Sequence, residues 1–150
     1  MLKYPGLRNN LIFTLRALAD PVYQQKVWVD SITPREGYID NFDEAVHCIF
    51  DALSLEMHLE AAIDVILQDP READMVKALV QSLNAALNNV PSNVPDQMFI
   101  ESDYWPAVVR TAREAYTALT GGQNPNGMFE DLQKGWMINP NSGLVSDTTG

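Results

Sequence analysis

The strongest constraint on the fold is a repeated signal for the start of a helix. Aspartate followed by proline occurs at Asp20-Pro21 and again at Asp69-Pro70. Aspartate is a favoured cap at the amino end of a helix, and proline is favoured at the first helical position because the amide hydrogen that it lacks would have no partner there. A third start is predicted at Asn41, where Glu44 follows three residues later in a variant of the capping box.

Apolar residues recur at helical spacing after each of these starts and in two other stretches. Five helices are predicted: one ending near Ala19, a short one from Pro21 that breaks at residues 31–37, one after Asn41, one from Pro70 to about Asn88, and one from about Asp103 to Gly121. Trp105 lies on the apolar stripe of the last helix and is predicted to be core. The predicted fold is mainly α, a single-domain bundle of about five helices.

Two stretches are harder to assign. Residues 59–68 read LEAAIDVILQ and fit either a continuation of the third helix or a small strand pair near Val65, because periodicity does not decide so short a run. We expect residues 1–119 to form the helical domain and residues 120–150 to form an irregular tail rich in glycine and asparagine. Apolar clusters at Met128-Phe129 and at residues 136–138 are predicted to pack this tail on the domain or on a partner.

The whole net charge of the chain lies in less than a third of its length. The 150 residues have a formal net charge of -10, and residues 30–74 hold twelve of the twenty acidic residues with only two basic ones. A one-sided field attracts cationic partners or keeps a protein soluble. It disfavours direct contact with nucleic acid, whose affinity comes mainly from neutralising phosphates.

Other features favour a cytoplasmic protein. Cys48 is the only cysteine, so an internal disulfide is impossible. The first residues lack the apolar core of a signal peptide, and no segment reaches the 18 apolar residues of a membrane span. We therefore expect a cytoplasmic location and no membrane contact, while the oligomeric state stays open.

The helix after Asn41 places polar side chains on one face. Asp43, His47 and Asp51 follow at four-residue intervals, and such a set could bind a divalent metal or act as an acid/base pair. A small metal-assisted or acid/base enzyme is therefore the alternative function. A metal site needs three or four converging ligands, however, and His58 is the only other histidine. We expect a solvated face, with no metal, no cofactor and no catalytic residue.

The same region is predicted to bind a protein partner. Tyr38 follows Gly37 and is flanked by carboxylates, and a ring in such a patch can receive an arginine or lysine. The predicted partner-binding residues are Glu36, Tyr38, Asp40, Asp43, Glu44, His47 and Asp51.

Three segments carry a resemblance: LADPVYQQKVWVD at residues 18–30, FDEAVHCIFD at 42–51 and YWPAVVRTAREA at 104–115. In this order and spacing they resemble a family of short uncharacterised bacterial proteins, best represented in actinobacteria. The likeness covers about residues 15–119 and implies no catalytic residues, and the tail departs from it. In size, acidity and lack of motifs the chain is also similar to immunity proteins of contact-dependent growth inhibition and other polymorphic toxin systems.

These features together predict an immunity protein, not an enzyme, that binds and neutralises a cognate bacterial toxin domain. The toxin is predicted to be a basic nuclease, because an enzyme that approaches phosphates carries lysine and arginine that a carboxylate field can find and cover. A structural partner subunit, acidic for solubility only, is the second alternative. The identity and activity of the toxin stay open, as does the choice between the acidic stretch and the tail as the binding surface.

Overall fold

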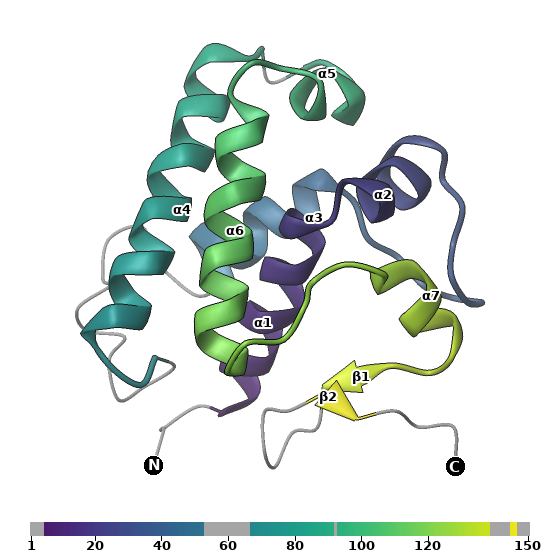
Figure 1. The fold of residues 1–150 in the computed structure, drawn as a ribbon. Helices are drawn as coiled ribbons and strands as arrows, with labels where there is room; N and C mark the ends of the chain where they lie inside the picture. The colour runs from purple at the N-terminus through teal and green to yellow at the C-terminus, as the bar shows by residue number, and fades with distance from the viewer. Residues whose placement is uncertain (1–4, 53–66, 92, 139–144, 147–150) are drawn as a thin grey trace.

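The computed structural model describes residues 5–52, 67–91, 93–138 and 145–146, and their architecture is mainly helical (Figure 1). The helices are α1 (Pro5–Ala19), α2 (Pro21–Tyr23), α3 (Phe42–His47), α4 (Pro70–Asn89), α5 (Asp96–Ile100), α6 (Trp105–Thr120) and α7 (Met128–Gln133). Helices α2 and α3 continue as wider π-helical segments, Gln24–Val29 and Cys48–Ala52. The mainly α prediction is confirmed. No helix among the described residues is long and apolar enough to cross a membrane.

The predicted helix starts are confirmed by their caps. In each cap a side-chain oxygen accepts a hydrogen bond from a backbone amide two or three residues further on, at 2.9 to 3.2 Å: Asp20 from Val22 and Tyr23, Asn41 from Glu44, and Asp69 from Glu72. Helix α6 ends at Gly121, whose φ of 71° lies in the left-handed region that glycine adopts without strain.

Helix α1 lies at the centre of the bundle (Figure 1). It packs along α6, and α6 packs along α4, while α3 and its π-helical continuation lie against α1. Fully buried leucines of α1 and α4 fill this layer: Leu11, Leu15, Leu18, Leu79 and Leu83. The loop of residues 30–41, which we call the acidic loop, and the cavity described below therefore rest on a buried apolar layer.

Two arginines of α1 point into the protein instead of toward solvent. Arg8 binds both carboxylate oxygens of Glu72, at 2.8 and 2.9 Å, and donates to the carbonyl oxygen of Leu119 at 3.2 Å. Arg16 pairs with Asp131 at 2.5 Å and donates to two carbonyl oxygens in the loop before α7. Buried charges need such paired and hydrogen-bonded partners. The two arginines thus connect α1 to the start of α4, the end of α6 and the tail.

The strand pair expected near Val65 is not seen. Residues 53–66 lie outside the described part of the chain. They include most of residues 59–68, for which the sequence left both helix and strand open. The strands that the described residues form are β1 (Met137–Ile138) and β2 (Val145–Ser146), which pair antiparallel.

Two short helices were missed, so the predicted number of helices was too low. Helix α5 and helix α7 have five and six residues, too few for a readable apolar period, and such helices depend on tertiary packing. The prediction of an irregular tail was wrong over α7. The predicted role of Met128-Phe129 is confirmed, because both side chains are buried against the body, and Trp136 is buried as well.

Trp105 is confirmed as a core residue, with 3% of its surface exposed. Its Nε1 donates to the buried Oε1 of Gln24 at 2.9 Å, and its ring meets those of Trp28 and Phe42. We expect Trp105→Ala to lower the free energy of unfolding by about 3–5 kcal/mol in urea denaturation, because it leaves a cavity and an unpaired oxygen. Tyr104→Ala is the control, and this exposed neighbour should change stability by less than about 0.5 kcal/mol. Equal losses in the two variants would contradict the assignment.

Candidate functional site

The acidic loop before α3 is held on the core by one carboxylate, that of Asp40. Its Oδ2 accepts hydrogen bonds from Nε1 of Trp28 at 3.0 Å and from the hydroxyl of Tyr23 at 2.6 Å. The Tyr23 hydroxyl lies 2.5 Å from that of Tyr38. A phenol has one proton and a carboxylate only accepts, so Tyr23 donates to Asp40 and Tyr38 donates to Tyr23. This chain of hydrogen bonds fixes the loop.

Burial changes the acidity of this network. Loss of hydration raises the pKa of Asp40 above its usual value and the Glu44 carboxylate raises it further, although hydrogen bonds from Trp28, Tyr23 and the Asn41 amide lower it. Burial also raises the pKa of the Tyr23 and Tyr38 hydroxyls, so both remain protonated donors.

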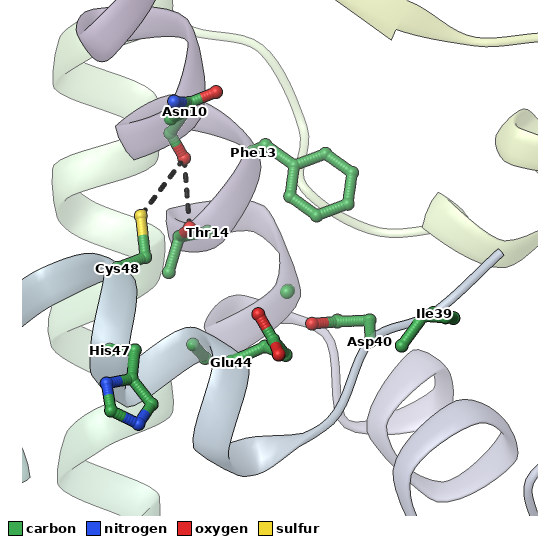
Figure 2. A pocket seen from close by; sticks show the side chains of 10 residues that line it. Asn10, Phe13, Thr14, Ile39, Asp40, Glu44, His47 and Cys48 are labelled. Atoms are coloured by element: carbon green, nitrogen blue, oxygen red, sulfur yellow. Dashed lines mark hydrogen bonds between the residues drawn. The ribbon is translucent and has the colours of Figure 1, made fainter. Parts of the chain in front are cut away.

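A cavity of about 330 Å³ opens beside Asp40 (Figure 2). It is lined by residues of α1, of the acidic loop, and of α3 with its continuation: Asn10, Phe13, Thr14, Ala17, Ile39, Asp40, Glu44, Ala45, His47 and Cys48. Figure 2 shows the carboxylates of Asp40 and Glu44 directed toward each other, with the ring of Phe13 on another side of the cavity and His47 directed away. One part of the wall is therefore anionic and another is aromatic.

The aromatic wall is held in place from behind. Phe13 stacks on Trp136 with ring centroids 5.9 Å apart and an interplanar angle of 23°. The guanidinium of Arg16 lies over the Trp136 ring, 4.7 Å from its centroid. The tail thus supports a cavity residue of α1.

Further carboxylates surround the start of α3. Asp43 and Glu44 are exposed, and Asp96 of α5 accepts a hydrogen bond from the Phe42 amide at 3.2 Å. Burial and the nearby Asp43 charge raise the pKa of Asp96, while the bond from Phe42 lowers it. We call Asp40, Asp43, Glu44 and Asp96 the acidic face. Among the described residues, no lysine or arginine forms an ion pair with any of the four.

The structure places the predicted partner-binding residues in different environments. Glu36, Asp43, Glu44 and His47 are exposed. Asp40, Glu44 and His47 line the same cavity. Asp40 itself is half-buried and anchors the loop, so it is not a simple surface charge.

The Tyr38 side chain packs on the protein and does not stand free in the loop. The ring is half-buried against the core, and the hydroxyl is bonded to that of Tyr23. The guanidinium of Arg35 lies over it, 5.9 Å from the ring centroid, so this ring already contacts a cation. The part of Tyr38 in binding a partner stays a prediction.

The alternative enzyme was predicted to use Asp43, His47 and Asp51, and the Asp51 side chain lies outside the described residues. The side chains that are described contain no group of three or more His, Cys, Asp or Glu suited to a metal ion. The Cys48 thiol donates to the Asn10 carbonyl oxygen at 3.7 Å, and burial raises the pKa of Cys48, which disfavours the reactive thiolate.

Sequence reasoning missed Phe13, Ile39 and Asp96. Phe13 lies on α1 and Asp96 on α5, and only the tertiary fold brings them to α3. Ile39 carried a readable signal, because it is a large apolar residue within a run of charged and polar ones. It is 81% exposed beside Asp40.

Asp40→Asn tests the electrostatics of the loop. The amide keeps an acceptor for Trp28 and Tyr23 but removes the charge that burial disfavours. The pKa of Asp40 is higher in the folded protein than in the unfolded chain. The contribution of Asp40 to the free energy of unfolding is therefore fully present below its unfolded-state pKa and is lost as pH rises through its folded-state pKa. We expect the variant to melt higher than the parent at about pH 7, with an advantage that shrinks toward about pH 4. The exposed Asp74→Asn is the control, and a difference for Asp40→Asn that is constant with pH would contradict this account.

Comparison with known proteins identifies the family but no activity. A family model described as a domain of unknown function, DUF7945, matches residues 2–126, which include α1 to α6 and the acidic face. No curated protein and no solved structure matches the chain. The resemblance to an uncharacterised family is thereby confirmed, and the chain belongs to the DUF7945 family.

Proposed function

We propose that this protein is an immunity protein that binds a cognate toxin domain through the acidic face and occludes it. The observation that carries the proposal is the gathering of four carboxylates around the start of α3, without a described lysine or arginine paired to them. Like charges held together repel one another, and a cationic partner relieves that repulsion.

The partner is proposed to be a basic nuclease domain. Such an enzyme carries lysine and arginine where it approaches phosphates, and a carboxylate surface of complementary potential speeds encounter and selects the partner. Ile39 supports a protein partner, because it offers an exposed apolar contact beside the charges. Interfaces commonly combine an apolar centre with a polar rim.

The acidic face is also prepared for binding. The first turn of α3 is fixed by Asn41 and Asp96, and the loop is fixed by Asp40. A surface that is already ordered loses less conformational entropy on association.

The test uses the toxin candidate encoded immediately upstream of this chain's gene, where the toxin partner of an immunity gene usually lies. We expect the protein to restore growth to bacteria producing that domain and to form an equimolar complex whose association slows as salt rises. The variant Asp43→Asn/Glu44→Gln/Asp96→Asn keeps the Asp40 anchor and an acceptor for the Phe42 amide. It should bind at least about tenfold more weakly and protect poorly.

A matched control removes three charges elsewhere. The exposed residues Asp74, Asp103 and Glu114 are changed to amides, which alters the net charge by the same amount. This variant should bind and protect as the parent does. Equal loss in both triple variants, or full protection by both, would contradict the acidic face, and a parent that neither binds nor protects would contradict the proposed function.

A further inference from the structure

We propose that the cavity between α1 and α3 receives the side chain of one arginine of the bound partner. This inference rests on the proposed function and names one contact between the protein and its partner. The cavity volume, its two unlike walls and the contacts that hold these walls in place support it.

The cavity has the size of a small binding site. Its volume of about 330 Å³ lies at the lower end of the roughly 300–1,000 Å³ of ligand pockets. Such a space suits one long side chain. Ile39 stands at its edge, where the methylene groups of an entering side chain would pass.

The two walls match a guanidinium group in particular. A guanidinium forms forked hydrogen bonds with carboxylates and packs flat on aromatic rings, whereas the ammonium of lysine is a compact, strongly hydrated charge. Asp40 and Glu44 supply the carboxylates, and Phe13 supplies the ring (Figure 2). The chain already contains two contacts of the same kind, Arg16 over Trp136 and Arg35 over Tyr38.

The cavity walls are preformed. Phe13 is stacked on Trp136, and Asp40 is held by Trp28 and Tyr23. The donors to Asp40 are neutral groups, so they stabilise the carboxylate without cancelling its charge. Among the described residues, no lysine or arginine forms an ion pair with Asp40 or Glu44. An entering arginine would supply that cation.

Cys48 provides a direct probe, since it lines the cavity and is the only cysteine. Its thiolate attacks the sulfenyl sulfur of a methanethiosulfonate, which forms a mixed disulfide and releases methanesulfinate. Labelling rates are measured with a trimethylammonium reagent and with a sulfonate reagent, each divided by its rate with a small free thiol. The cationic reagent should then be favoured by about tenfold or more, because an anionic cavity concentrates it. Glu44→Gln should lower this preference, whereas Glu114→Gln should leave it unchanged.

The second arm tests arginine itself. N-acetyl-arginine amide should slow labelling of Cys48 by neutral methyl methanethiosulfonate, while the uncharged citrulline analogue should not, and Glu44→Gln should weaken the protection. Absence of charge preference, equal protection by both analogues, or a thiol that reacts only in urea would overturn the inference.

The two proposals can fail separately. If arginine does not protect Cys48 but the acidic-face variant loses the toxin, the cavity inference fails and the proposed function stands. If arginine protects Cys48 but the parent does not bind the toxin domain, the proposed function fails.

Discussion

The acidic face depends on how Asp40 is held. Its carboxylate binds the loop to Trp28 and Tyr23, and Tyr38 joins the network through Tyr23. The same carboxylate borders the cavity together with Glu44. Neutral donors stabilise the charged form of Asp40 while leaving its negative charge in place. One side chain therefore fixes the loop and, together with Glu44, makes the cavity anionic.

Buried side chains of the interior also support the cavity wall. Arg8 and Arg16 are two of the ten basic residues, and both are buried in pairs with carboxylates. Each pair cancels its own charge, so the rest of the chain keeps the formal net charge of -10. Arg16 also packs on Trp136, which supports Phe13 in the cavity wall. Trp136 lies beyond residue 126, where the match to the family model ends, so the support of this wall comes from outside the matched region.

Local signals predicted the parts of the fold that local interactions determine. The caps at Asp20, Asn41 and Asp69 act within three residues, and they were readable for that reason. The inward direction of Arg8 and Arg16 was not readable, because their partners lie 64 and 115 positions away. The sequence drew attention to Asp40, Asp43 and Glu44 but not to Asp96, which another helix brings to them. The half-buried positions of Asp40 and Tyr38 depend on tertiary packing that periodicity does not report.

The central claim is that the half-buried carboxylate of Asp40 binds a cation, the guanidinium of an arginine. Carboxyl-carbon NMR of Asp40 tests this claim most directly. The carboxyl is titrated in the free protein and again with N-acetyl-arginine amide. The account predicts a pKa above the ordinary 3.8 in the free protein and a lower apparent pKa with arginine, because a bound guanidinium favours the ionised form. An ordinary pKa in the free protein, or titration curves that coincide with and without arginine, would contradict it.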